Sequence, residues 1–295
     1  MIREVYRKNM AFELTGLYEA STKDQLHNFL IQLQHSSKRF SSTKAPKNWL
    51  DAFQLLMQYI DGLKNKKKKV IFIDEFPWIA SARSSFLSAF EHFWNTYCTK
   101  RNDLIVVVCG SAASFMINKI IKNKGGLHNR ITHKIRLMPF NLQEVKQFLL
   151  KKNIKLSNYD ILQLYMVMGG VPYYLNHIKK GESVAQNIDR LCFSDHGALV
   201  DEFNSVFQSL FSNSEVHQRI IRALAKVKKG VSRKKLLEIC GIKSGGVFSK
   251  ALNELTESGF AIQNKAFSKK TKDSLYSLTD EYSLFYLKFM EQHKG

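Results

Sequence analysis

The sequence predicts an α/β fold in which a parallel sheet with covering helices is followed by a helical region and a small C-terminal domain. Two apolar runs, VIFI at 70–73 and LIVVVC at 104–109, suit strands that are buried on both faces. Segments with apolar residues at helical spacing lie before and between these runs. Strands and helices that alternate in this way are typical of a parallel sheet packed against helices.

The elements of the sheet region follow one another within the first 140 residues. The chain begins like the tail of a helix at 2–9, because no capping residue precedes Ile2. Strands are predicted at Met10–Thr15, 70–74, Leu104–Cys109 and Lys134–Met138, the last of them stopped by Pro139. Helices are predicted at about 22–36, 47–63 and 84–98.

From residue 141 the pattern changes twice. Residues 141–210 read as helices only, with a GGVP turn at 169–172. An amphipathic helix at 215–226 is followed by a helix that Ser232 caps and Gly241 ends, and by a third helix that Ser244 precedes and that runs to Glu257. Residues 260–278 read as a hairpin, so the end of the chain has the outline of a winged helix. The predicted domains are therefore an α/β core at 1–140, a helical region at 141–212 and a winged helix at 213–295.

Composition and charge limit the function. The hydrophobic fraction of 44% is ample for a packed core, and the net charge of +20 favours a polyanionic partner, most often nucleic acid. The alternative is a Lys-rich surface without such a partner. The run Lys66–Lys69, taken alone, reads as a solvated loop rather than a binding site.

Membrane, metal and disulfide classes are not expected. No apolar run approaches the roughly 18 residues of a membrane span, and the N-terminus lacks a signal peptide's apolar stretch. The four cysteines lie far apart and form no CxxC pair. These features predict a cytoplasmic protein with reduced thiols and no membrane partner.

Candidate site residues follow the buried strands. Asp74 and Glu75 directly follow the first apolar run, where an Asp can hold Mg²⁺ and a Glu can activate water. Two exposed acids opening a loop are the alternative. Ser111 follows the neighbouring strand and either senses a γ-phosphate or caps a helix, two roles that are compatible. Arg130 either reaches nucleotide phosphates or lies on the surface.

The C-terminal domain carries candidate phosphate contacts. Its predicted recognition helix begins near Lys243 and includes Lys250, while the predicted hairpin tip carries Lys265, Lys269, Lys270 and Lys272. Lysines in such places suit nucleic-acid phosphates, which position a protein without specifying sequence. The alternative is a winged helix that docks on protein.

The motifs also occur in the order of one known family. The series runs IFIDEFPWIA, VVVCGSAASFM, GLHNRI, MGGVPYYL and YSLTDEYSLFYLKFME. It resembles the prokaryotic ATPases of the AAA+/STAND type and covers essentially the whole chain. The resemblance implies an AAA+-like P-loop NTPase core with strand order 5-1-4-3-2, a helical lid and a winged helix, with ATP and Mg²⁺ as cofactors.

The resemblance also implies roles for individual residues. Asp74 and Glu75 match the Walker B pair, with Asp74 as the metal ligand. Ser111 matches the sensor-1 region, and Arg130 matches an arginine that usually follows Gly, where this chain has Asn129. The implied catalytic residues are Glu75, Ser111 and Arg130, and the implied cofactor-binding residues are Asp74, Gly110, Gly170 and Pro172.

Two departures from the family shape the functional expectation. The 295 residues contain no GxxxxGK[ST] motif, with which family members usually open, and no nuclease-like domain after the winged helix. We therefore expect a chain that starts just after the Walker A motif, binds ATP weakly or not at all, and tends to aggregate. The leading expectation is an ATP-binding regulator. The alternative is a non-catalytic nucleic-acid-binding protein with a vestigial ATPase core. DNA or another polyanion, a second copy or a protein partner are the partners considered.

Overall fold

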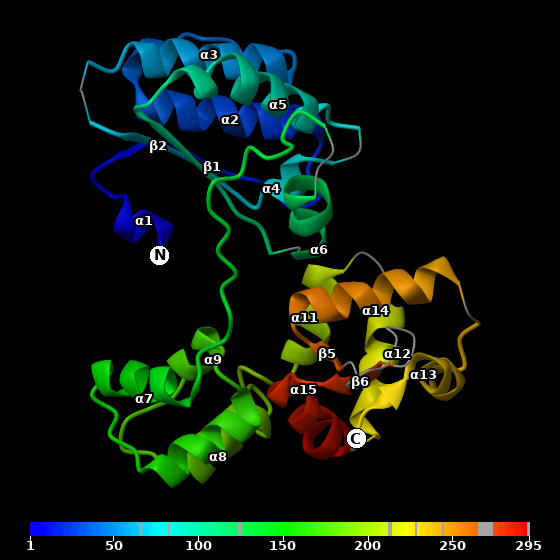
Figure 1. Ribbon diagram of the computed structural model, residues 1–295. Coiled ribbons are helices and arrows are strands. Elements are labelled where there is room, and N and C mark those ends of the chain that lie inside the picture. Colours follow the sequence, from blue (N-terminus) through cyan, green and yellow to red (C-terminus); the bar gives the residue numbers. More distant parts are fainter. Residues whose placement is uncertain are drawn as a thin grey trace. The chain divides into compact units, whose positions relative to one another are not determined.

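The computed structural model describes the chain except for residues 65–66, 82, 112, 123–124, 212–213, 228, 244, 265–273 and 294–295. The chain divides into two compact units, Met1–Lys134 and Ile135–Gly295, shown in blue to green and in green to red (Figure 1). Among the described residues, every helix is too short or too polar to cross a membrane. Lys265, Lys269, Lys270 and Lys272 lie outside the described residues.

The first unit is built on a parallel sheet of three strands. These are β1 (Met10–Thr15), β2 (Lys69–Asp74) and β3 (Leu104–Val108), in the order β1-β2-β3. Ile73 of β2 pairs with Leu14 on one side and Val108 on the other. The three strands and their parallel arrangement are confirmed, and their order matches the adjacent strands 4-3-2 at one end of the implied order 5-1-4-3-2.

The long helices of the first unit form a layer beside the sheet (Figure 1), with a continuous aromatic core. The helices are α1 (Ile2–Val5), α2 (Thr22–Ser36), α3 (Trp49–Asp61), α4 (Phe76–Ile79), α5 (Phe86–Thr96) and α6 (Ala113–Phe115), and α2, α3 and α5 lie together beside the strands (Figure 1). A π-helical turn at Met116–Ile121 and 3₁₀ turns at Lys38–Phe40 and Cys98–Lys100 complete the unit. Ser21 and Asn48 cap α2 and α3 by accepting hydrogen bonds from the backbone N–H three residues on. The rings of Phe53, Phe86 and Phe93 pack together in the core.

The predicted strand at Lys134–Met138 is wrong. Residues 131–140 are extended chain that forms no ladder with a described strand, and Ile135 and Leu137 are 73% and 71% exposed. A strand needs a hydrogen-bonded neighbour, which this segment lacks among the described residues. From Ile135 onward this segment belongs to the second unit, and two hydrogen bonds join it to other parts of that unit. Arg136 Nη2 donates to Glu257 O at 2.6 Å, and Phe140 N donates to Gly170 O at 2.7 Å.

The first part of the second unit is helical, as predicted. It contains α7 (Leu142–Lys151), α8 (Asn158–Met168), α9 (Pro172–Asn176), α10 (Val184–Cys192) and α11 (Glu202–Leu210). Capping boxes begin three of these helices, at Asn141, Ser157 and Ser183. The local sequence therefore determines where these helices start.

The rest of the second unit alternates helices with a small antiparallel sheet. It contains α12 (Ser214–Ala225), β4 (Val231–Ser232), α13 (Arg233–Cys240), α14 (Gly246–Ser258), β5 (Ala261–Asn264), β6 (Leu275–Leu278) and α15 (Glu281–Phe285), followed by turns at Tyr286–Met290 and Glu291–His293. The sheet order is β4-β6-β5. The predicted cap is confirmed, since Ser232 Oγ accepts from Lys235 N at 3.3 Å. Both parts of this unit share one core, in which the rings of Phe203 and Tyr286 stack with their centroids 4.5 Å apart.

Candidate functional site

The carboxyl ends of the three parallel strands meet at Asp74. The backbone carbonyl of Asp74 accepts a hydrogen bond from Gly16 N at 2.9 Å, just beyond β1. On the other side, Cys109 N donates to Ile73 O at 3.0 Å, and Phe76 N donates to Cys109 O at 2.9 Å. These bonds fix the chain where β2 ends, so the two acids occupy defined positions at this edge.

Three donors surround the Asp74 carboxylate. Its Oδ1 accepts from Glu75 N at 3.1 Å and from Cys109 Sγ at 2.7 Å, and its Oδ2 lies 3.3 Å from Arg3 Nη2. Burial, together with the neighbouring Asp74, raises the pKa of the Cys109 thiol to about 12. The thiol therefore stays protonated at neutral pH and acts as a donor. Arg3 Nε also pairs with Glu13 Oε1 at 2.5 Å. The hydrogen bond from Arg3 to Glu13 raises the pKa of the Arg3 guanidinium.

Glu75 turns toward the end of the neighbouring strand. Its backbone lies in the left-handed region, with φ +47° and ψ +46°, which is sparsely populated for a residue with a side chain. Its Oε2 accepts from Ser111 N at 3.1 Å and from Ser111 Oγ at 2.9 Å. Asp74, Glu75 and Ser111, which the sequence placed at two strand ends, thus form a chain of hydrogen bonds at one edge, in which Glu75 contacts both Asp74 and Ser111.

Gly110 lets the segment after β3 approach α4. A Cβ on this residue would lie 2.3 Å from Pro77 Cδ and 2.7 Å from Pro77 Cγ. Both atoms belong to a ring that cannot rotate away. Gly110 therefore allows Ser111 to reach Glu75, whether or not a nucleotide also contacts it.

Arg130 is exposed and follows a turn. Its backbone N donates to Leu127 O at 3.1 Å. Asn129, which stands where the family resemblance implies Gly, has φ +55°. Asn is among the few residues that tolerate this conformation, so the substitution keeps the backbone that glycine would adopt.

Gly170 and Pro172 belong to the second unit. A Cβ on Gly170 would lie 1.7 Å from Phe140 O, so the two backbones are in direct contact. Pro172 is the first residue of α9, a position where its missing N–H leaves no helical bond unmade. Lys250 is exposed on α14, with its Nζ 3.9 Å from Glu254 Oε1.

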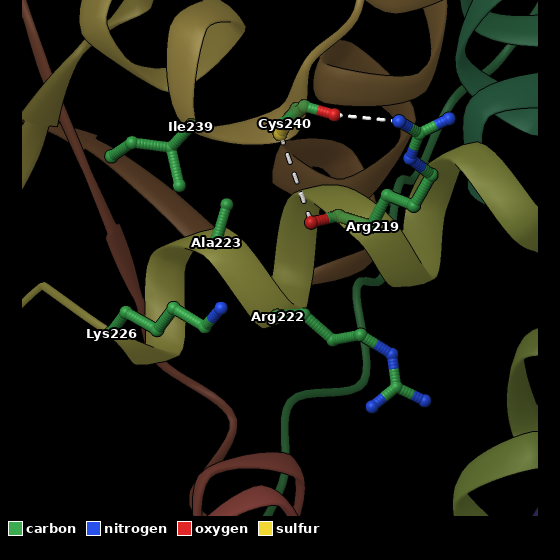
Figure 2. A pocket seen from close by; sticks show the side chains of 6 residues that line it. All are labelled: Arg219, Arg222, Ala223, Lys226, Ile239 and Cys240. Atoms are coloured by element: carbon green, nitrogen blue, oxygen red, sulfur yellow. Dashed lines mark hydrogen bonds between the residues drawn. The ribbon is translucent and has the colours of Figure 1, made fainter.

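A pocket of about 160 Å³ lies between α12 and α13 in the second unit. It is lined by Arg219, Arg222, Ala223, Lys226, Ile239 and Cys240 (Figure 2). The two arginine side chains point away from each other. Arg219 donates to Cys240 O at 2.7 Å (Figure 2). Arg222 pairs with Glu291. Both guanidinium groups are engaged within the protein, so the pocket does not offer a converging set of free cations.

Sequence reasoning missed three side chains at the strand-end site. Cys109 had a signal, because it directly precedes Gly110 at the end of an apolar run. Arg3 and Glu13 had none, since Arg3 lies 71 residues from Asp74 in sequence. Among the described residues no group of three or more His, Cys, Asp or Glu is placed to hold a metal alone. Asp74 offers a single carboxylate, which fits Mg²⁺ only where phosphate oxygens and water complete its shell.

A family of known domains matches this chain over residues 3–178, which include both strand-end acids, Ser111 and Arg130. It is described as an ATPase domain predominantly from Archaea. The chain belongs to this family. The description of this family implies use of ATP. The matched residues include the whole parallel sheet and the two acids at its carboxyl edge.

Comparison with individual proteins gives the fold and one distant relative. A Walker-type ATPase of Pyrococcus abyssi has a TM-score of 0.67 at 13% identity, over 98% of this chain and 87% of that chain. A STAND protein with a tetratricopeptide repeat sensor from Pyrococcus horikoshii has a TM-score of 0.33 at 16% identity, over 94% of this chain and 36% of that chain. An uncharacterized protein of Methanocaldococcus jannaschii is 23% identical over 228 residues, 76% of this chain. The match covers 49% of that relative, so the chain spans about half of the relative's length.

Proposed function

We propose that this chain is part of an ATP-dependent regulator whose nucleotide site lies at the carboxyl edge of the parallel sheet. The observation that carries the proposal is the contact between Glu75 and Ser111 beside Asp74. Ligands of open parallel sheets bind outside the carboxyl ends of the strands, and these side chains come from two neighbouring strand ends. Membership in the ATPase-domain family selects ATP as the ligand.

Each residue has a distinct role in this proposal. Asp74, as the Walker B aspartate, would hold Mg²⁺, which would supply neutralisation of the phosphate charge. Glu75 orients and polarises the attacking water. Ser111 holds the Glu75 carboxylate through two hydrogen bonds, and in this proposal it exchanges them for a γ-phosphate oxygen when nucleotide binds. Arg130 contributes a charge to the phosphates.

The proposed nucleotide site is tested by the DNA sequence upstream of residue 1 and by the substitutions Glu75→Gln and Asp74→Asn. Residues 1–295 contain no GxxxxGK[ST] motif, and we expect this polypeptide to bind Mg-ATP far more weakly than micromolar by calorimetry. An in-frame GKT directly upstream of codon 1 supports the proposal. In the polypeptide extended by that segment, Glu75→Gln should lower the hydrolysis rate by about 10²–10⁴-fold.

The control for this test is Glu215→Gln, which makes the same chemical change at an exposed position of α12. Hydrolysis should be unchanged in that variant. Two results would contradict the assigned roles. One is an equal rate of ATP hydrolysis in Glu75→Gln and Glu215→Gln. The other is a micromolar affinity of residues 1–295 for Mg-ATP that the substitution Asp74→Asn does not change.

A second candidate function is nucleic-acid binding by a C-terminal winged helix. The supporting observation is the order α12, β4, α13, α14, β5, β6 with the sheet order β4-β6-β5, since three helices and a three-stranded sheet make up that fold. Lys250 is exposed on α14, the proposed recognition helix. Lysines at 269, 270 and 272, outside the described residues, would add phosphate contacts.

This candidate predicts salt-dependent binding. Changing Lys250, Lys269, Lys270 and Lys272 to Ala should weaken binding to a DNA duplex and lower the slope of log K against log salt by about 0.9 for each phosphate that the variant no longer neutralises. Fluorescence anisotropy at several salt concentrations measures both. Duplex binding that is independent of salt, or an unchanged slope in the variant, would argue against it.

A further inference from the structure

Exposed cations from separate segments of the first unit gather at the amino edge of its parallel sheet. We call this surface the basic edge and define it by six exposed side chains: Lys38, Arg39, Lys64, Lys67, Lys68 and Lys100. Parallel strands all enter a sheet from one edge. The segments before β2 and β3 therefore meet there, with Lys69 opposite Leu104 in the register.

Hydrogen bonds join the segments that enter the strands. Asn9 Nδ2, before β1, donates to Lys68 O at 2.9 Å. Lys68 Nζ donates to the backbone carbonyl of Asn102, before β3. Residues 67–68 are thereby held between the other two strand entrances.

The helix ends are tied to the same edge. Asp61, at the end of α3, accepts from Tyr97 Oη at 2.6 Å and pairs with Arg101, next to Lys100. Arg39 Nη1 would lie 3.4 Å from a Cβ on Gly62, which places the turn after α2 beside the end of α3. The helix layer and the strand entrances thus present their cations on one side of the unit.

The basic edge has little negative charge to balance it. Segments 36–41, 61–69 and 97–103 contain nine Lys or Arg and two acids, Asp61 and Asp103. Both acids are already paired, because Asp103 binds buried Lys69 at 2.8 Å and both Asp61 and Asp103 bind Arg101. None of the six basic-edge residues forms an ion pair with another described residue.

Helix termini explain only part of this charge. Helices α2, α3 and α5 all end at this edge, and cations are favourable beside helix C-termini. That effect accounts for about one cation at each of these three helices. It does not account for Lys67 and Lys68, which precede a strand rather than follow a helix.

We propose that the basic edge binds the sugar-phosphate backbone of nucleic acid without reading its sequence. Lysine and arginine clusters supply the phosphate contacts that dominate such binding. No large apolar side chain that is exposed in the described chain lies within the three segments, so the surface lacks the apolar anchors that favour a membrane. The six residues of β2, at about 3.3 Å each, separate this edge from Asp74 by roughly 15–20 Å. The basic edge is therefore distinct from the proposed nucleotide site, and the inference rests on neither proposed function.

Matched triple substitutions in the full chain test the proposal. Lys64, Lys67 and Lys68 are changed to Gln, and the control changes Lys151, Lys155 and Lys180, three exposed lysines of the second unit, to Gln. The probe is a short fluorescein-labelled DNA duplex of mixed sequence, titrated from about 50 to 200 mM KCl. We expect the edge variant to bind at least about tenfold more weakly, with a salt slope smaller by about 2–3. The control should keep the affinity of the unchanged chain.

Several outcomes would overturn the proposal. Equal weakening of the edge and control variants would show that net charge alone attracts DNA. Loss only on changing Lys250, Lys269, Lys270 and Lys272 would assign binding to the C-terminal region instead. The proposal would also be refuted if the unchanged chain did not bind the duplex. It would equally be refuted if the chain bound phosphatidylserine vesicles through the basic edge but did not bind the duplex. Unaltered urea unfolding of all variants confirms that the comparison concerns binding.

Discussion

Replacing Phe76 by alanine is expected to destabilise the first unit by about 3–5 kcal/mol. Phe76 directly follows Glu75 and is fully buried, with ring centroids 5.0 Å from Phe86 and 5.2 Å from Phe90. Its removal leaves a cavity that surrounding rings cannot fill, because aromatic side chains reorient little in a packed core. The left-handed backbone of Glu75 also depends on this anchor, so the contact between Glu75 and Ser111 should weaken at the same time.

Urea unfolding with peptide-level hydrogen exchange measures both effects. Peptides that cover β2 and residues 75–79 should lose protection in Phe76→Ala and keep most of it in Phe76→Leu, which costs less than about 1.5 kcal/mol. The control is Leu50→Ala on α3, where the side chain is 54% exposed and the change should stay within about 0.5 kcal/mol. If Phe76→Ala unfolds at the same urea concentration as Leu50→Ala, the ring does not hold the strand end.

Elements with a strong local signal could be predicted from the sequence. Val70–Ile73 form an uninterrupted apolar run, and β2 proved to be the central strand of the sheet. Ser232 was predicted as a cap and accepts the expected backbone bond. In contrast, β4 has only two residues, and no periodicity can show in so short a segment. The strand expected at Lys134–Met138 failed because an apolar alternation does not by itself supply a pairing partner.

The candidate site was predictable where topology alone brings residues together. Asp74 and Ser111 follow neighbouring parallel strands, and the carboxyl ends of such strands share an edge. The left-handed backbone of Glu75 was not predictable, because no Gly or Asn marks the position. Arg3 reaches Asp74 across 71 residues of sequence, which a linear pattern does not show. The basic edge shows the same limit, since Lys67 and Lys68 read alone as a solvated loop.

Replacing Gly170 by alanine is expected to lower the free energy of unfolding of the second unit by about 3 kcal/mol. The new Cβ would lie 1.7 Å from Phe140 O and 2.6 Å from both Phe140 C and Phe140 N. All three are backbone atoms, so no rotamer change relieves the clash. The segment before α7 must then move, which breaks the 2.7 Å bond from Phe140 N to Gly170 O and disturbs the packing of Phe140 on Phe148.

The same substitution separates a packing role from the nucleotide contact implied for Gly170. The control is Gly246→Ala in the first turn of α14, where a Cβ would meet no atom of the described residues within 4 Å. That variant should be as stable as the unchanged chain, or more stable by up to about 1 kcal/mol, because alanine favours the helix. Urea unfolding in the absence of nucleotide compares the two. A loss of stability in Gly170→Ala alone assigns the glycine to backbone packing, since no ligand is present in that measurement. If the two variants have equal unfolding midpoints, the close approach of Phe140 does not constrain this turn, and the reason for glycine at 170 must lie with a bound ligand.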